Sequence, residues 1–230
     1  MEENAIYKGI KDIINQFLII ILYIFLSIIL QLILIKDISS HNFSLVNLSY
    51  IFIELILLIV FILIFRKKLV PDFYDFKKNG KNYIKNNWQY WLYGLIIMLI
   101  LNAIISSFIG LPTNEESVRN LLTKIPIYSI ISTIICGPII EELMTRTILK
   151  DTFKNHYIYY ILSGLIFGSL HLLSATNINE IFYIFSYGTL GYFFALIYDK
   201  TNNIWTNIFF HSLHNTLAIL IVFLSYLVGV

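Results

Sequence analysis

Seven long apolar stretches divide this chain of 230 residues, and they constrain its fold more than any other feature. The hydrocarbon core of a bilayer requires about 20 apolar residues per helix. Lipid admits only helices and closed barrels, and no stretch has the alternating pattern of a barrel strand. The sequence therefore predicts an all-α, polytopic transmembrane helical bundle. We expect spans at approximately Ile13–Ile35, Leu45–Phe65, Trp88–Ile109, Ile125–Leu149, Tyr157–Ser174, Glu180–Tyr198 and Ile204–Val228.

The composition agrees with a membrane protein, since 58% of the residues are hydrophobic and 13% are charged. Soluble domains carry about 25% charged residues. The first apolar run is too long for a cleaved signal peptide, so we interpret it as a retained span. Gly137 and Pro138 interrupt the fourth span, which predicts a kink or a break there. The single cysteine, Cys136, excludes an intrachain disulfide and lies in an apolar stretch, where we expect a packing role.

Lys and Arg are distributed unevenly between the two sides of the predicted bundle. With the N-terminus inside, 13 of the 16 Lys and Arg lie in or next to the inner segments. The positive-inside rule then places the chain in the cell membrane with a cytoplasmic N-terminus and, for seven spans, an external C-terminus. The basic connection Arg66–Asn87 is expected to contact the anionic inner leaflet. Asp72 and Asp75 interrupt its basic charge, so we expect no nucleic-acid partner.

The late spans carry polar residues that are costly in lipid, about 2.5 kcal/mol or more for a charge at a helix centre. These residues are Glu141, Glu142, Arg146, His171, His211 and Asn215. Three polar clusters on three helices are hard to explain as packing alone. We therefore expect a shared polar site, with residues 1–124 as scaffold spans and residues 125–230 as the catalytic core of a single bundle.

Helical spacing divides the first cluster into a pair and a single residue. Glu142 and Arg146 are four residues apart, so they share a helix face and are expected to form a structural ion pair. Glu141 points about 100° away and has no local partner. A carboxylate without a nearby cation in a medium of low dielectric constant suits a general base near neutral pH.

The other two clusters contribute imidazoles and an amide. Phe167 and His171 are one helical turn apart, and His211 shares a face with Asn215, with His214 at its border. An imidazole and an amide presented together can donate hydrogen bonds to a developing oxyanion, and imidazole is also a common zinc ligand. Counted along each helix, Glu141 lies about 13 Å from the end of its span and His171 about 21 Å, so their depths overlap only loosely.

The ordered motifs resemble those of the CPBP family, which includes the CAAX prenyl endopeptidases and the bacterial Abi-type membrane proteases. The pattern Glu-Glu-x-x-x-Arg begins at Glu141, Phe-x-x-x-His at Phe167 and His-x-x-x-Asn at His211. The resemblance covers about residues 125–216. This chain has Thr145 and Thr147 where the family often has an aromatic residue and a glycine, which affects the expected packing around Arg146.

The resemblance implies an intramembrane peptidase of the CAAX type. Glu141 would activate water, His171 would share the proton handling, and His211 and Asn215 would stabilise the oxyanion. Glu142, Arg146 and Phe167 would support the site. We expect no cofactor, although Glu141, His171 and His211 would be the ligands if a metal is present; the HExxH motif of many zinc proteases is absent.

Family analogy points to a membrane-associated peptide or protein as substrate, in bacterial peptide maturation or bacteriocin immunity. One alternative is a non-catalytic scaffold or immunity protein with the same fold. A small transporter ranks third, because the chain has one candidate helix break rather than two in matching halves. Glu54, in the middle of the second span, is expected to pair with a polar group of another helix.

Overall fold

The computed structural model describes residues 43–228 and, before them, residues 11, 14–15, 18–19, 21–26 and 29. Within residues 43–228 the fold is all-α, as predicted. Its α-helices are α2 (Phe43–Ile109), α3 (Thr113–Lys124), α4 (Pro126–Ile131), α5 (Gly137–Thr152), α6 (His156–His171), α7 (Tyr183–Thr201) and α8 (Ile204–Val228). A π-helical turn, η1 (Ser132–Cys136), and a 3₁₀ turn, η2 (Ile178–Phe182), complete it.

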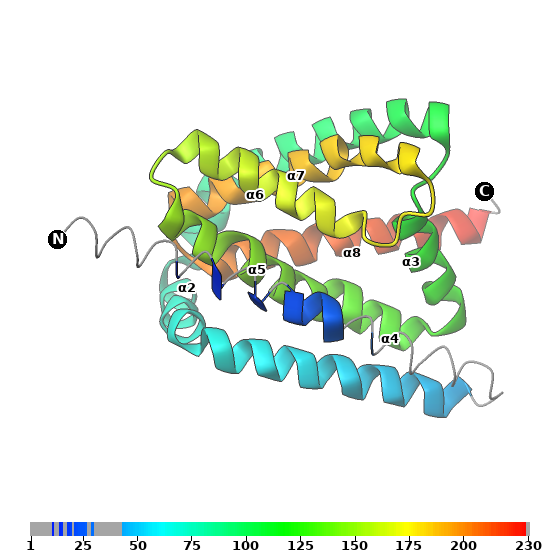
Figure 1. Ribbon diagram of the computed structural model, residues 1–230, viewed down its shortest axis with the longest axis horizontal. Coiled ribbons are helices and arrows are strands. Elements are labelled where there is room, and N and C mark those ends of the chain that lie inside the picture. The colour runs from blue at the N-terminus through cyan, green and yellow to red at the C-terminus, as the bar shows by residue number, and fades with distance from the viewer. Residues whose placement is uncertain are drawn as a thin grey trace.

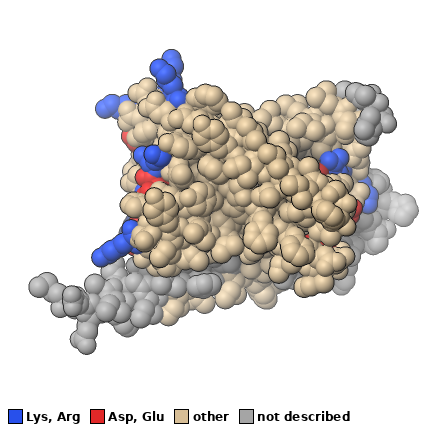
Figure 2. All heavy atoms as spheres, turned by 90° about the horizontal axis from the view of Figure 1, so that it is seen from above, with Lys and Arg blue, Asp and Glu red and all other residues tan. Residues whose placement is uncertain are grey.

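Four of these helical segments are long and apolar enough to cross a membrane: Leu48–Ile109, Pro126–Thr152, Ile178–Thr201 and Ile204–Tyr226. The first expected span, Ile13–Ile35, lies mostly outside the described residues. Helix α6 has 16 residues, fewer than the 18 or more of these four segments. Figure 2 shows the charged side chains gathered toward the two ends of the molecule, with a broad belt of other residues between them.

Helix α2 contains both the second and the third expected span, together with the polar connection between them. Its 67 residues would extend about 100 Å if straight. Figure 1 shows instead that the ribbon runs along the lower edge of the view, turns at the left and returns along the upper edge. The connection is therefore helical, and Asp75 accepts hydrogen bonds there from Asn79 at 2.7 Å and Tyr83 at 2.9 Å.

The polar middle of α2 fixes where α8 begins. Asp72 accepts a hydrogen bond from the backbone N–H of Ile204, the first residue of α8, at 2.8 Å. Asn203 donates to the carbonyl of Asp72 and to the carboxylate of Asp75, both at 2.8 Å. A carboxylate at a helix N-terminus satisfies free N–H groups and opposes the helix dipole. These bonds set the depth of α8 and of His211, two turns further along.

The fourth expected span is irregular, as Gly137 and Pro138 indicated. The π-helical turn η1 separates α4 from α5, and Pro138 lies in the first turn of α5. Proline has no N–H to donate to the preceding turn, so it favours a local rearrangement of the helix. Cys136 closes the π turn and is fully buried, which agrees with its predicted packing role.

Helices α6 and α7 pack unusually closely, since glycines face each other between them. A Cβ atom built on Gly164 would lie 2.5 Å from the carbonyl oxygen of Gly188. One built on Gly191 would lie 2.7 Å from Cβ of Phe167. This contact places the last turns of α6, which carry Phe167 and His171, beside α7.

Helix α3 lies in a segment that the sequence analysis treated only as a connection. Its N-terminus is held by Glu180 of η2, which accepts from both the backbone N–H and the hydroxyl of Thr113 at 2.8 Å. The same carboxylate accepts from the backbone N–H groups of Thr176 and Asn177 at 3.1 Å. Helix α3 is therefore fastened to the segment that leads into α7. The division into scaffold and catalytic parts stays a prediction.

Candidate active site

Glu142 is the centre of a fully buried polar network. It accepts from Nε of Arg146 at 2.9 Å, from Nδ2 of Asn207 at 3.0 Å and from Nδ1 of His211 at 3.0 Å. Arg146 also donates to the hydroxyl of Ser163. The structure thus confirms the ion pair that helical spacing predicted. It adds Asn207 and Ser163, which come from other helices and gave no signal in the local spacing.

Aromatic rings enclose the guanidinium of Arg146. Its Cζ atom lies 5.2 Å from the ring centroid of Phe167 and 5.9 Å from that of Phe194. Rings at this distance attract a cation through their quadrupole. The hydroxyls of Thr145 and Thr147, the two departures from the family pattern, each donate to a carbonyl of their own helix. Arg146 is therefore tightly packed despite these substitutions.

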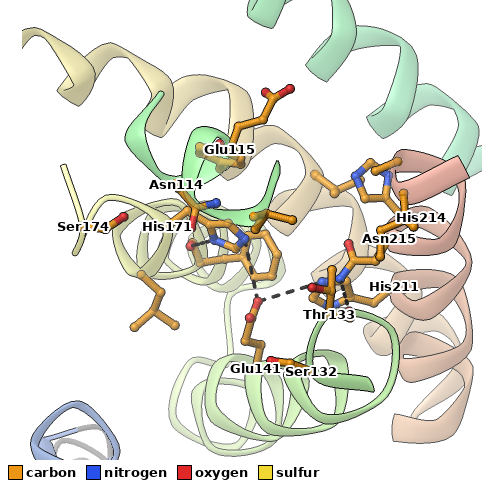
Figure 3. A pocket seen from close by; sticks show the side chains of 18 of the residues that line it. Asn114, Glu115, Ser132, Thr133, Glu141, His171, Ser174, His211, His214 and Asn215 are labelled. Carbon is orange, nitrogen blue, oxygen red and sulfur yellow. Dashed lines mark hydrogen bonds and ion pairs between the residues drawn. The ribbon is translucent and has the colours of Figure 1, made fainter. Parts of the chain in front are cut away.

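Glu141 points toward two imidazoles, those of His171 and His211, as Figure 3 shows. Its Oε2 atom lies 3.8 Å from Nε2 of His171 and 3.9 Å from Nε2 of His211. Both distances exceed hydrogen-bond length. The Oε2 atom is buried and has no hydrogen-bond partner among the described residues. The structure therefore brings these three predicted residues together around one carboxylate oxygen.

The hydrogen bonds of His171 and His211 indicate which ring nitrogen carries a proton. Nδ1 of His171 lies 3.0 Å from the carbonyl oxygen of Phe167, which can only accept, so Nδ1 carries a proton. In the neutral ring, Nε2 then presents a lone pair toward Glu141. Nδ1 of His211 donates to Glu142 in the same way.

The depths counted along the expected spans had placed His171 and Glu141 at different levels. That count takes no account of how the helices tilt or of where α6 begins.

Asn215 belongs to the same region but has a different partner. Its Nδ2 atom donates to the backbone carbonyl of Thr133, in the π turn, at 2.7 Å (Figure 3). A π turn changes which carbonyl each backbone N–H of the helix bonds. Asn215 donates to one of the carbonyls of this turn. Nδ1 of His214, one residue earlier, is buried without a hydrogen-bond partner among the described residues.

A cavity of about 610 Å³ opens onto these residues. Glu141, His171, His211 and Asn215 line it together with Ser132, Thr133 and Gly137. Glu54 lies on the wall contributed by α2 and accepts from the hydroxyl of Ser132 at 2.9 Å, so its predicted pairing with another helix is confirmed.

The sequence analysis missed the lining residues from α3 and α7, among them Asn114, Glu115 and Tyr187. The first two lie in a polar connection that has no apolar run. Tyr187 is one of 16 tyrosines in the chain, so nothing in the sequence distinguished it.

The donor geometry at Glu141 does not fit a metal site. Among the described residues, no group of three or more His, Cys, Asp or Glu side chains is arranged to hold an ion. Tetrahedral zinc at about 2.0–2.2 Å from its N and O ligands brings those ligands to roughly 3.3 Å from one another. The Oε2 atom of Glu141 is farther than that from both imidazoles, at 3.8 and 3.9 Å.

Comparison with known proteins gives a family for this part of the chain. Residues 123–217 match the family described as type II CAAX prenyl endopeptidase Rce1-like. The chain is 28% identical over 110 residues to "Putative membrane peptidase YdiL" of Bacillus subtilis (strain 168), a match that covers 46% of this chain and 42% of the relative. It is 32% identical over 116 residues to "UPF0177 protein YaiH" of Lactococcus lactis, with 50% and 47% covered. No solved structure matches the chain.

The matched residues include all the site residues that the sequence predicted. They extend from the end of α3 to the first half of α8 and include Glu141, His171, His211 and Asn215. The matches span less than half the length of these curated relatives. The resemblance drawn from the three motifs is confirmed. Over residues 123–217, the chain is similar to the Rce1-like family of type II CAAX prenyl endopeptidases.

Proposed function

We propose that this chain is an intramembrane peptidase that hydrolyses a peptide bond of a membrane-associated peptide or protein. One observation carries the proposal: the buried Oε2 atom of Glu141 faces two imidazole Nε2 atoms across gaps of 3.8 and 3.9 Å. A water molecule hydrogen-bonded to the carboxylate and to one ring fits such gaps. The family supports the same reading, since its name describes an endopeptidase.

In the proposed reaction, Glu141 takes a proton from water while the water oxygen attacks the carbonyl carbon of the scissile bond. His171 accepts a hydrogen bond from the same water through the lone pair on Nε2, and so orients it. The tetrahedral intermediate then loses its amine, which receives the proton held by Glu141. Acid–base catalysis by a positioned carboxylate contributes about 10²- to 10⁴-fold.

His211 is the proposed donor to the oxyanion. Because Nδ1 of His211 already donates to Glu142, Nε2 can donate only when the ring is protonated. Glu142 stabilises that imidazolium, and with Arg146 and an ionised Glu141 the four charges sum to zero. Asn215 supports the same region through the carbonyl of Thr133, and the second N–H of its amide remains available to the substrate.

The proposed substrate class follows from the setting and from the family. The site lies between helices that include long apolar segments, so a substrate reaches it from the bilayer or its surface. We propose the cell membrane as location, with a cytoplasmic N-terminus, from the distribution of Lys and Arg. By analogy with the family, the biological role is peptide maturation or bacteriocin immunity.

The test compares membrane and secreted peptides of a wild-type strain with those of a strain carrying Glu141→Ala. If the chain is a peptidase, we expect an uncleaved precursor to accumulate in the mutant while the variant protein reaches normal levels. Glu116→Ala, an exposed substitution on α3, is the matched control. If Glu141→Ala abolishes a phenotype without changing any peptide, or keeps the phenotype, the chain acts as a non-catalytic scaffold or immunity protein.

A further inference from the structure

Tyr187 of α7 lies against the imidazole of His171. The two ring centroids are 4.6 Å apart and the rings are inclined by only 23°. The ring centroid of Phe167 lies 4.7 Å from that of the same imidazole. His171 is the last residue of α6, so the helix does not continue beyond it to hold its side chain. The stacked rings and the bond from Nδ1 to the carbonyl of Phe167 set the direction of Nε2.

The hydroxyl of Tyr187 lies close enough to the side chain of Asn114, on α3, to interact with it. Asn114 directly follows Thr113, whose N–H and hydroxyl both bond Glu180 at 2.8 Å. Glu180 belongs to η2, which leads directly into α7 and so back to Tyr187. These contacts therefore form a closed set that connects α3, η2 and α7 beside His171.

Part of this set of contacts lines the cavity. Asn114, His171 and Tyr187 all border it, and Figure 3 labels Asn114 and His171 among the lining side chains. Tyr187 is partly buried, and the face of its ring stacks against His171. A side chain placed in this way can orient the imidazole without touching the reacting atoms.

We propose that Tyr187 is a positioning residue, anchored by Asn114, which holds the imidazole of His171 with Nε2 directed at Glu141. The proposal rests on the proposed peptidase function. It assigns the stack to the aromatic ring and the anchoring to the hydroxyl, so the two parts of the side chain have separable effects. Misplacing a catalytic group by about 1 Å costs about 100-fold in rate.

The test measures hydrolysis of an internally quenched peptide library by the full chain in detergent. Tyr187→Leu removes both the stack and the anchor, and we expect kcat to fall about 100-fold with KM unchanged. Tyr187→Phe keeps the stack and loses the anchor, and we expect a loss of less than about 10-fold. Phe185→Leu removes a well-exposed ring from the same helix, so it is the matched control and is expected to keep full activity.

Asn114 gives an independent arm of the experiment. Asn114→Ala is expected to reduce kcat as much as Tyr187→Phe does, and the double variant no further, because both remove the same interaction between Asn114 and the hydroxyl of Tyr187. Hydrogen exchange reports on the stack independently of activity: amides at the end of α6 should exchange faster in Tyr187→Leu than in Tyr187→Phe.

Three outcomes would overturn the proposal: unchanged kcat in Tyr187→Leu, a rise in KM alone, or equal losses in Tyr187→Leu and Tyr187→Phe. A rise in KM alone would mean that Tyr187 contacts the substrate, and equal losses would assign the effect to the hydroxyl. If the wild-type chain, like Glu141→Ala, cleaves no peptide of the library, the proposed function fails. If the wild type is active and Tyr187→Leu matches it, the positioning role alone fails.

Discussion

Nδ1 of His211 donates a hydrogen bond to Oε1 of Glu142 at 3.0 Å, while Nε2 of the same ring faces Glu141 at 3.9 Å. One imidazole thus connects two adjacent glutamates that have different surroundings. Glu142 has three hydrogen-bonding partners and is fully buried, whereas the Oε2 atom of Glu141 has none among the described residues. We therefore expect substitutions at the two positions to impair different properties of the protein.

We expect Glu141→Gln to lower kcat by about 1,000-fold or more while the protein keeps its thermal stability. The amide has the size of the carboxylate but cannot accept the proton of water. Peptide hydrolysis and thermal unfolding in detergent measure the two quantities on the same sample. Activity retained within 10-fold would exclude Glu141 as the base.

Arg146→Met should act on stability rather than on the reacting atoms. Methionine fills part of the space between Phe167 and Phe194 but leaves Glu142 as a buried charge without its cation. Breaking a buried pair on one side costs about 3–5 kcal/mol. We expect a lower unfolding temperature and less protein in the membrane. The double variant Glu142→Gln/Arg146→Met should recover part of the loss, because the unpaired charge is gone. If Arg146→Met is as stable as the wild type, the pair contributes little.

The sequence could predict what depends on neighbours within one helix. Glu142 and Arg146 are one turn apart, so their pair followed from spacing, and the apolar run of α8 gave its bounds, Ile204–Val228. Asn207 and Tyr187 could not be found in this way. Their roles depend on how α8 and α7 pack against α5 and α6, and this packing is set by glycines and by the bonds of Asp72 to the start of α8.

The π turn, α3 and the middle of α2 could not be predicted from the sequence for the same reason. Gly137 and Pro138 indicated a break, but the π turn, which offers the carbonyl of Thr133 to Asn215, needs the tertiary contact to be recognised. Helix α3 was missed because its polar sequence has no apolar run, and its position depends on Glu180, 67 residues away. The polar middle of α2 is helical because its carboxylates find partners within the helix and on α8.

Gly164→Ala should disrupt the contact between α6 and α7. The added Cβ would lie 2.5 Å from the carbonyl oxygen of Gly188, a backbone atom that cannot rotate away. The helices must separate, which would also displace Phe167 and His171. We expect lower thermal stability and a loss of kcat together. Ser169→Ala on the exposed side of α6 is the control, since its hydroxyl bonds only its own helix, and it should behave like the wild type.

The predicted orientation can be measured with single cysteines. Cys136 is fully buried, so it is not expected to react with maleimides. Lys78→Cys in the polar middle of α2 and Glu116→Cys on α3 are both at exposed positions. In intact cells, an impermeant maleimide should label Glu116→Cys alone, and Lys78→Cys should react only after the membrane is opened. The opposite pattern would invert the orientation derived from Lys and Arg.

Chelators are expected to leave hydrolysis unchanged. The proposed mechanism uses Glu141, His171 and His211 directly, and their separations of 3.8 and 3.9 Å are wider than the edges of a tetrahedral zinc site. Activity is measured before and after treatment with 1,10-phenanthroline and EDTA, together with the metal content of the purified chain by mass spectrometry. A loss of activity that added Zn²⁺ restores, with about one metal ion per chain, would make these three side chains ligands. In that case Glu141→Gln and His171→Ala should both lower the metal content, whereas the metal-free mechanism expects them to change only the rate.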